Sequence, residues 1–363
     1  MFEYNEAIAY AQAHEVGWPR DPAAEPARWG VHHDDPPPYN RLRGPVHARG
    51  GVSGVIRRHG REVAAWGEPD RADLTFSVAK TYLALLAGVA HMRGLLPDVD
   101  APVAARLPGI GFDDAHNSAV TWTHLLQQTS EWQGDCLGMP EQVEHHRRVP
   151  HDPKPPTGKK GERRELHAPG TYWEYNDVRI NQLSLALLHL FGRPLQQVFE
   201  EAILHPLGGG AAGSGWQWVG YDDAWVDIGG QRIQSVPGGS HWGGGVSISA
   251  RDQARIGQLM LDGGMHEGRP LLPPGWVERM RKQSPVAPFY GSLLWLNVDG
   301  AMFPDASRSS YFMTGAGGHY TWVDPEHDAV IVVRWLDGPH ATGFVARVAR
   351  VLAASSANGT ARG

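Results

Sequence analysis

The pattern of apolar positions divides the chain into a short strand region, a long helical middle and a second strand region. Two β-rich runs, Gly51–Arg57 and Glu62–Trp66, are broken around His59-Gly60-Arg61, which predicts a hairpin. In the C-terminal third, short β-rich runs occupy residues 292–298, 319–323 and 329–335, and turn-forming residues 324–328 join the last two. Apolar residues at helical spacing predict helices at Val78–Met92, 125–126, 180–191, 195–204, 251–261 with Ser249 as N-cap, and 341–354.

This order of elements predicts an α+β fold with an antiparallel sheet built from both chain ends, flanked by helices, and a mostly helical region inserted between the two halves. We expect residues 1–45 to form an irregular, Pro-rich leader on the surface, and 144–165 to be an exposed loop. The folded domain should span residues 46–355, with the sheet from about 46–75 and 288–355 and the helical region from about 76–287. Residues 356–363 are then a tail.

Composition excludes several classes of protein. The 363 residues carry a net charge of −6 without a concentrated basic segment, so nucleic acid is not an expected partner. Cys136 is the single cysteine, which excludes an internal disulfide and a cysteine-rich metal site. There is no apolar run of membrane-spanning length and no secretory signal in the first residues, so we expect a cytoplasmic protein that does not interact with membranes. Oligomeric state is left open.

The segment Ser77-Val78-Ala79-Lys80 opens the first predicted helix with a hydroxyl and an amine three residues apart. Such positions share a helix face, so the two groups can meet. A lysine held in a dry pocket can lose its charge and take the proton of the serine, which makes the hydroxyl a nucleophile. The helix N-terminus supplies N–H groups for a developing oxyanion. The structural alternative is that Ser77 caps the helix while Lys80 reaches toward solvent.

The same residues resemble the nucleophile motif of the serine β-lactamase and penicillin-binding-protein superfamily, in particular its class C branch with the related esterases and 6-aminohexanoate-dimer hydrolases. Four further segments are similar to that family in the same order. They are Leu125–Ser130, Tyr172–Asn181, Gly238–Gly245 with Ser249–Asp252 after it, and Met313–His319.

The resemblance implies roles for specific residues. Tyr175 would assist Lys80 in proton transfer, with Tyr172 as an alternative phenol, and Asp177 stands where the family's substrate-contacting asparagine is usual. Thr314 and Gly315 would line the cleft, and the amides of Ser77 and Ala316 would form the oxyanion hole. Met313 replaces the lysine that binds the acidic group of β-lactams, which argues against penicillin as the natural substrate.

Aromatic and histidine side chains near these motifs are further candidates. Trp132 and Trp242 are candidate walls of a substrate pocket, and His319 either contacts a leaving group or lies at the solvent edge of a strand. The segments His32-His33-Asp34-Asp35 and His145-His146 lack metal-site spacing, so we interpret them as solvated loops and expect no metal. Phosphate-binding and dinucleotide-binding glycine signatures are absent, so we expect no cofactor.

These observations predict a serine hydrolase that cleaves a small-molecule ester or amide through an acyl-serine intermediate. Two alternatives remain. One is a β-lactamase or D-amino-acid peptidase, and the other is a member of the fold that binds a ligand without catalysis.

Overall fold

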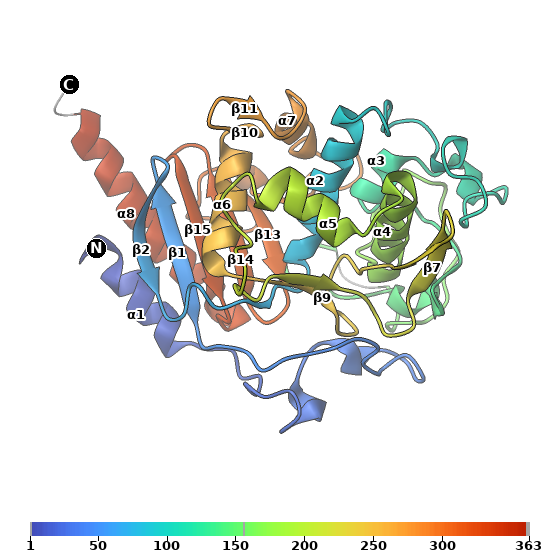
Figure 1. The fold of residues 1–363 in the computed structure, drawn as a ribbon. Coiled ribbons are helices and arrows are strands. Elements are labelled where there is room, and N and C mark those ends of the chain that lie inside the picture. The colour runs from blue at the N-terminus through green and yellow to red at the C-terminus, as the bar shows by residue number, and fades with distance from the viewer. Residues whose placement is uncertain (1, 155–156, 361–363) are drawn as a thin grey trace.

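The central element of the computed structural model, which describes residues 2–154 and 157–360, is a twisted antiparallel sheet (Figure 1). Its strands come from both ends of the chain, so the predicted α+β architecture is confirmed. In spatial order the strands are β12 (Trp295–Leu296), β13 (Tyr311–Gly315), β14 (His319–Asp324), β15 (Ala329–Arg334), β1 (Ser53–Arg58) and β2 (Arg61–Trp66).

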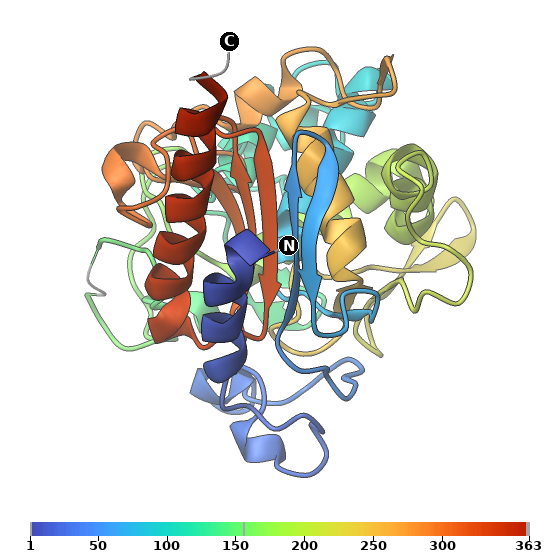
Figure 2. The ribbon, with the colours of Figure 1, turned by 90° about the vertical axis from the view of Figure 1, so that its left-hand side faces the viewer.

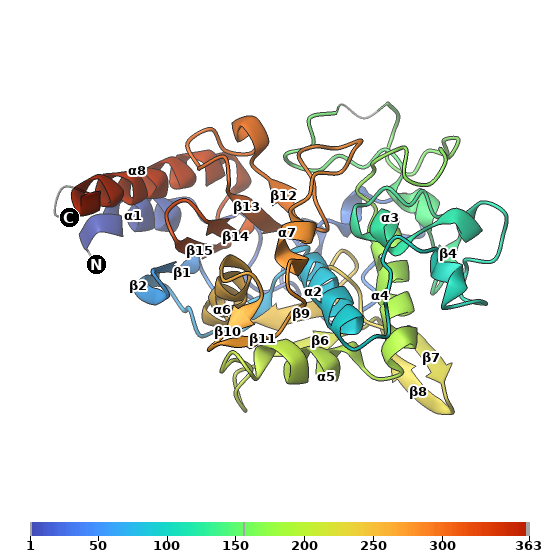
Figure 3. The same cartoon turned by 90° about the horizontal axis from the view of Figure 1, so that it is seen from above.

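Helices cover both faces of this sheet (Figures 2 and 3). The α-helices in the described part of the chain are α1 (Asn5–Ala13), α2 (Val78–Met92), α3 (Trp122–Leu126), α4 (Asp177–Phe191), α5 (Leu195–Phe199), α6 (Ala250–Leu261), α7 (Trp276–Met280) and α8 (Ala341–Thr360). Short 3-10 helices lie at Phe2–Tyr4, Pro26–Arg28, His32–Asp34, Val103–Ala105, Asn117–Ala119, Glu141–Glu144, Val298–Gly300 and Gly338–His340.

Small sheets accompany the helical region between the two halves of the main sheet. One has the order β3-β9-β6, and the others are two-stranded. Their strands are β3 (Asp73–Leu74), β9 (Gly245–Ile248), β6 (Gln217–Val219), β4 (Asp135–Cys136), β5 (Met139–Pro140), β7 (Trp225–Ile228), β8 (Gln231–Gln234), β10 (Met265–His266) and β11 (Arg269–Pro270).

The central strand β15 is buried on both faces, which accounts for its uninterrupted apolar sequence. Val330 and Val332 point into the core shared with α2, α4 and α6, whereas Ile331 and Val333 point into the core beneath α1 and α8. The sheet therefore separates two hydrophobic cores. α6 packs across β14, β15 and β1 on one face, and α1 lies beside α8 on the other (Figure 2).

Most predicted elements are present with altered ends. The hairpin forms β1 and β2, α2 begins and ends where the pattern placed it, and the Ser249 side chain caps α6 by accepting a hydrogen bond from the Asp252 amide. The helix predicted over 195–204 is α5 followed by a π-helical turn at Glu200–Leu204. β12 is shorter than predicted. α8 continues to Thr360 into the expected tail, of which residues 361–363 lie outside the described residues.

The prediction of an irregular surface leader at residues 1–45 is wrong. The segment begins with helix α1, whose Ala7 and Ala11 are buried against α8. Further along, Trp29 is buried and its ring lies 5.7 Å from that of Phe76, the residue before Ser77. The small residues of α1 allow close helix packing, a feature that the Pro-rich stretch after it obscured. The leader therefore belongs to the core that supports the start of α2.

We expect Trp29→Ala to lower the free energy of unfolding by about 3–5 kcal/mol, because it removes a fully buried indole from this core. Urea denaturation measures the change. The matched control is Trp225→Ala, since Trp225 is 42% exposed and should tolerate the same truncation. Equal stability of the two variants would show that the leader contributes little to the folded core.

Candidate active site

The start of α2 holds Ser77 in a strained turn. Phe76 has a φ of +51°, a left-handed conformation that is unfavourable for a side chain with a Cβ. Its ring is buried and packs against Trp18, Trp29 and Trp335, which holds the turn in place. Ser77 occupies the N-cap position, yet its side chain makes no capping hydrogen bond. The capping alternative is therefore wrong, and the hydroxyl is available for other contacts.

That hydroxyl accepts a hydrogen bond from the Lys80 amine, with Nζ and Oγ 2.7 Å apart. Lys80 is only 1% exposed, so it does not reach toward solvent. Burial lowers the pKa of Lys80 below that of a free lysine, against the opposing effect of the Asp177 carboxylate. A lysine with a lowered pKa in contact with a serine hydroxyl has the geometry of a base and its nucleophile.

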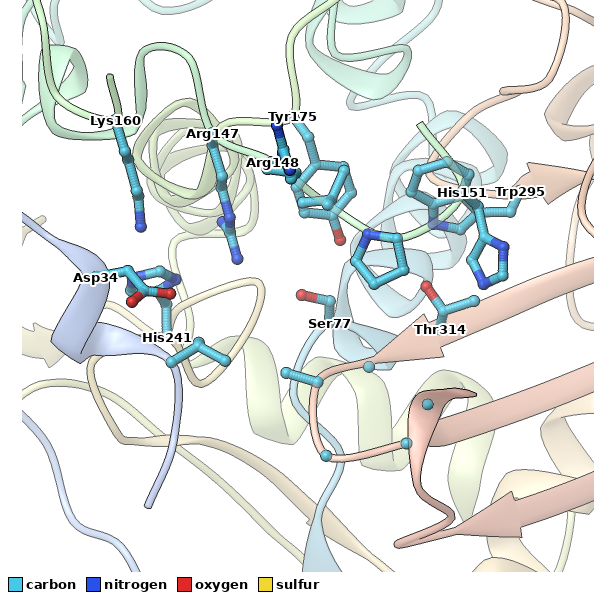
Figure 4. A pocket seen from close by; sticks show the side chains of 18 of the residues that line it. Asp34, Ser77, Arg147, Arg148, His151, Lys160, Tyr175, His241, Trp295 and Thr314 are labelled. Carbon is cyan, nitrogen blue, oxygen red and sulfur yellow. The ribbon is translucent and has the colours of Figure 1, made fainter. Parts of the chain in front are cut away.

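Tyr175, in the segment that leads into α4, lies close to the Ser77 hydroxyl. Its phenol oxygen points toward Ser77 (Figure 4), and the Lys80 amine lies 4.9 Å from the centre of its ring. The ring stacks on Trp295, at a centroid distance of 5.9 Å. Burial and the nearby Asp177 charge raise the pKa of Tyr175, while its hydrogen bond to Ser77 acts in the opposite direction. The phenol is therefore held in its protonated form, ready to donate.

The end of β13 and the turn after it pass close to Ser77. A Cβ on Gly315 would lie 2.1 Å from the Thr75 carbonyl oxygen, so only glycine permits this approach of the strand to the nucleophile turn. Gly318 has a φ of +74° and equally lacks space for a side chain. Among the described residues, the amides of Ser77 and Ala316 donate to no other group. Both therefore have an N–H to offer to a substrate oxygen.

A cavity of about 570 Å³ opens over these groups. Ser77, Tyr175 and Thr314 line it (Figure 4), and Gly315 and Ala316 belong to the same lining. One wall is charged and the other is aromatic and apolar. The charged wall includes Asp34, Arg147, Lys160 and His241, and the other includes Val149, Pro150, His151, Trp295 and Tyr320.

Asp177, the first residue of α4, does not line the cavity as expected for a substrate contact. Its carboxylate instead forms ion pairs with the buried Lys80 amine and with Arg147, whose Nη1 lies 2.5 Å from Oδ2. These cations overcome the effect of burial and hold the pKa of Asp177 well below its usual value. The acidic residue that replaces the family's asparagine thus acts as a counterion of Lys80.

The two segments interpreted as solvated polar loops are partly buried at this site: His32, Asp35 and His145 are buried, whereas His33 and Asp34 are exposed. Asp35 is 4% exposed, and it accepts hydrogen bonds from the ring of His241 at 2.8 Å and from the indole of Trp242 at 2.7 Å. Glu144 and His145 are buried as well, so the prediction of an exposed loop at 144–165 fails at its start. These charged groups can be buried because each is paired with an opposite charge or a hydrogen-bond donor on a distant segment, and the spacing of residues along the chain does not reveal such pairs.

Asp35, Glu144 and His241 bring three donor atoms within 4.8 Å of one another. That spacing is typical of a cation site. The cation that contacts both carboxylates is the Lys160 ammonium, which pairs with Asp35 and lies 3.0 Å from Glu144. We therefore assign these residues to an ion-pair network in which Lys160 supplies the positive charge.

Three other predicted site residues lie away from the cavity. The Trp132 indole is buried and donates to the Gly111 carbonyl at 2.7 Å, and Trp242 is buried with its indole on Asp35. His319 is neither at a solvent edge nor in the cavity, because it is fully buried and its ring packs on Trp335 at 4.3 Å. All three are packing residues. Tyr172 is half-buried, stacks on His167 and also lies outside the cavity lining.

A second buried network fixes the loops around Tyr175. Arg179 on α4 pairs with Glu131, Glu141 and Glu174, and Arg164 pairs with Glu131 and Glu174. Although burial alone would raise it, the two guanidinium groups hold the pKa of Glu131 at about 2. Ion pairs therefore fix the segment that carries Tyr175 both before it, through Glu174, and after it, through Arg179.

Sequence reasoning missed several residues of the site. Arg147, Arg148 and Lys160 come from the segment predicted as an exposed loop, and Val16, Trp18 and Asp34 from the expected leader. His241 was part of a recognised glycine-rich motif but received no role. One signal could have indicated that these segments are buried: they combine many charged residues with Val, Pro and Trp.

Comparisons with known proteins show what this chain resembles. A family model described as Beta-lactamase matches residues 40–354. The 6-aminohexanoate-dimer hydrolase of Paenarthrobacter ureafaciens is 35% identical over 102 residues, a match that covers 24% of this chain and 24% of that protein. This chain therefore matches about a quarter of the length of that relative.

Solved structures extend the similarity to nearly the whole fold. A penicillin-binding-protein homologue from Caulobacter crescentus has a TM-score of 0.57 at 16% identity, over 93% of this chain and 99% of that one. A D-stereospecific amidohydrolase from a Streptomyces species has a TM-score of 0.54 at 17% identity, over 81% and 92% of the two chains. At such identities the likeness concerns the fold. Within residues 2–154 and 157–360, the helices lack the combined length and apolar character that crossing a membrane requires.

We expect Arg179→Met to destabilise the protein by about 3–5 kcal/mol at pH 7, because it removes the guanidinium shared by three buried carboxylates. Glu131 and Glu174 then keep Arg164 as their partner, and Glu141 keeps the ring of His145. Those carboxylates then have raised pKa values in the folded state, so protonation relieves them and the deficit relative to wild type should shrink as the pH falls from 7 to 4. Denaturant unfolding at both pH values measures this. Arg193→Met, which breaks an exposed pair with Glu201, should have almost no effect. A deficit that grows toward pH 4 would contradict the charge argument.

Proposed function

This chain belongs to the β-lactamase family, and on that premise we propose that it is a serine hydrolase that cleaves an ester or amide bond through an acyl-serine intermediate. The observation that carries the proposal is the contact between Ser77 and the buried Lys80 beneath an open cavity. The similarity to named hydrolases and amidohydrolases supports the class of reaction. The nucleophile, the base and the covalent step are our inference from the geometry.

In the proposed acylation, neutral Lys80 takes the proton of Ser77 while Oγ forms a bond to the substrate carbonyl carbon. The electron pair of the carbonyl moves to its oxygen, which the amides of Ser77 and Ala316 stabilise. Each such donor contributes about 2.7–4 kcal/mol to the transition state. When the carbonyl re-forms, the bond to the leaving group breaks, and the proton on Lys80 passes through Tyr175 to that group.

Deacylation repeats these steps with water as the nucleophile. Water gives a proton to the Lys80–Tyr175 pair as its oxygen attacks the acyl carbon, and the proton returns to Ser77 Oγ as the ester bond breaks. Both half-reactions need Lys80 neutral at their start. The lowered pKa of Lys80 supports this requirement.

The two walls of the cavity indicate the kind of substrate. The aromatic wall with Trp295 and Tyr320 suits an apolar chain, and the charged wall suits a polar or ionised end. Met313 on β13 is 1% exposed and carries no charge, so this strand offers no cation to a β-lactam carboxylate at that position. We therefore place linear esters and amides ahead of β-lactams.

We expect Ser77→Ala to abolish turnover of p-nitrophenyl butyrate, because within residues 2–154 and 157–360 the hydroxyl that accepts a hydrogen bond from Lys80 is that of Ser77. Intact-mass analysis of wild type across a panel of esters, amides and β-lactams should show an acyl adduct that Ser77→Ala lacks. A folded Ser77→Ala variant that retains the wild-type rate would refute the proposal.

Stable labelling of Ser77 by a fluorescent penicillin, without ester turnover, would favour a penicillin-binding activity instead. Ligand-dependent stabilisation of a protein that never forms an adduct would favour a binding role.

We expect Tyr175→Phe to lower kcat by about 10²–10⁴ with little change in KM, because it removes the proton donor and keeps the ring that stacks on Trp295. Tyr172→Phe is the matched control, since Tyr172 lies outside the cavity lining and should leave the rate near wild type. Stopped-flow or steady-state ester hydrolysis distinguishes the two. A larger loss in Tyr172→Phe would assign the phenol to position 172.

A further inference from the structure

Beneath the cavity lies a cluster of charged side chains in which the basic groups outnumber the carboxylates. They come from the N-terminal segment, α2, the 141–160 segment, α4 and the glycine-rich segment before β9, and their side chains are at most 15% exposed. The cluster contains three carboxylates and four basic groups: Asp35, Glu144 and Asp177 with Lys80, Arg147, Lys160 and His241.

Two of the positive charges are settled by their contacts. An arginine is always charged, and Arg147 pairs with both Glu144 and Asp177. Lys160 pairs with Asp35 and Glu144, whereas the amine that donates a hydrogen bond to Ser77 is that of Lys80. Three carboxylates in a buried site need a third positive charge, and either Lys80 or His241 supplies it.

Asp177 lies between these two candidates. Its Oδ1 faces the Lys80 amine, and its Oδ2 faces Nδ1 of His241 at 3.2 Å. The other ring nitrogen of His241, Nε2, lies 2.8 Å from Asp35 and 3.8 Å from Glu144. Both ring nitrogens therefore face carboxylate oxygens. A neutral imidazole has a single N–H, so only the imidazolium form offers a hydrogen to each side.

We propose that His241 is a positioning residue that carries the third positive charge of this cluster and so leaves Lys80 neutral for the proton of Ser77. The inference rests on the proposed function. With His241 charged, the three carboxylates are balanced by Arg147, Lys160 and His241. Lys80 can then lose its proton without leaving a buried carboxylate uncompensated.

The surroundings of both groups favour this distribution. Burial and the Arg147 charge lower the pKa of Lys80. For His241, the carboxylates of Glu144, Asp177 and Asp35 raise the pKa despite burial and the opposing charge of Arg147. Among the other titratable neighbours, burial lowers the pKa of His32 to about 4 and raises the pKa of Tyr175 and of Tyr221, so these three rings are neutral at pH 7 and do not compete for the charge.

The first variant to test is His241→Asn. Without the imidazolium, three carboxylates face only Arg147 and Lys160, so Lys80 should keep its proton to a higher pH. The acidic limb of kcat/KM for p-nitrophenyl butyrate should move up by at least about one pH unit, with a loss of about tenfold or more at pH 7 and recovery at alkaline pH. His327→Asn is the matched control, because His327 pairs with Asp324 on the sheet away from the cavity and should leave the profile unchanged.

The decisive variant is the double substitution Asp35→Asn with His241→Asn. It leaves two carboxylates for Arg147 and Lys160, which restores the balance around a neutral Lys80. The acidic limb should return toward that of wild type. A merely structural role of His241 predicts that the double variant is at least as impaired as the single one, at every pH.

The outcomes separate this inference from the proposed function. If a fluorophosphonate probe does not label Ser77 in the wild-type protein, the proposed function fails. If Ser77 is labelled but the acidic limb of His241→Asn coincides with that of wild type, or the double variant does not restore it, the role of His241 is overturned. Should His241→Asn fail to fold by circular dichroism, nitrogen-15 shifts of the His241 ring in wild type decide the question, because a neutral ring at pH 7 also overturns the proposal.

Discussion

The proposed mechanism depends on keeping one amine, that of Lys80, uncharged in a buried position. Lys80 contacts Ser77 at 2.7 Å and is shielded from water, and burial favours its neutral form. An isolated buried lysine would lose its proton readily but would be a weak base toward the serine hydroxyl, whereas one paired tightly with a single carboxylate would stay protonated. The fold resolves these opposing demands by sharing the Asp177 carboxylate among Lys80, Arg147 and His241.

This sharing links parts of the chain that are far apart in the sequence. Asp35 comes from the N-terminal segment, Lys160 from the segment after the 3-10 turn at Glu141–Glu144, and His241 from the glycine-rich stretch before β9. Their contacts place charged side chains beside the nucleophile and also close the cavity on one side (Figure 4). The N-terminal segment therefore contributes in two ways, through the aromatic packing that supports Phe76 and through the carboxylate that orients His241.

Local sequence patterns predicted the parts of the structure that local physics determines. The helix from Val78 to Met92, the cap at Ser249 and the hairpin of β1 and β2 follow from periodicity and from short-range hydrogen bonds. Ser77, Lys80 and Tyr175 were predicted to meet because they belong to one motif set; the structure brings them together, and their catalytic roles remain our proposal. The predictions for Trp132, Trp242 and His319 failed because membership in a motif-bearing loop does not determine which way a side chain points.

The charged segments show why the remaining error arose. Sequence reasoning treats a run such as His32-His33-Asp34-Asp35 as solvated, because burying charge is unfavourable unless a partner is present. Here the partners of Asp35 are Lys160, 125 residues further along the chain, and His241, 206 residues further along. A rule based on nearest neighbours cannot find such partners. In this fold, excess charge in a Pro-rich segment marks long-range ion pairing around the buried Lys80, and the candidate site is where local patterns are least informative.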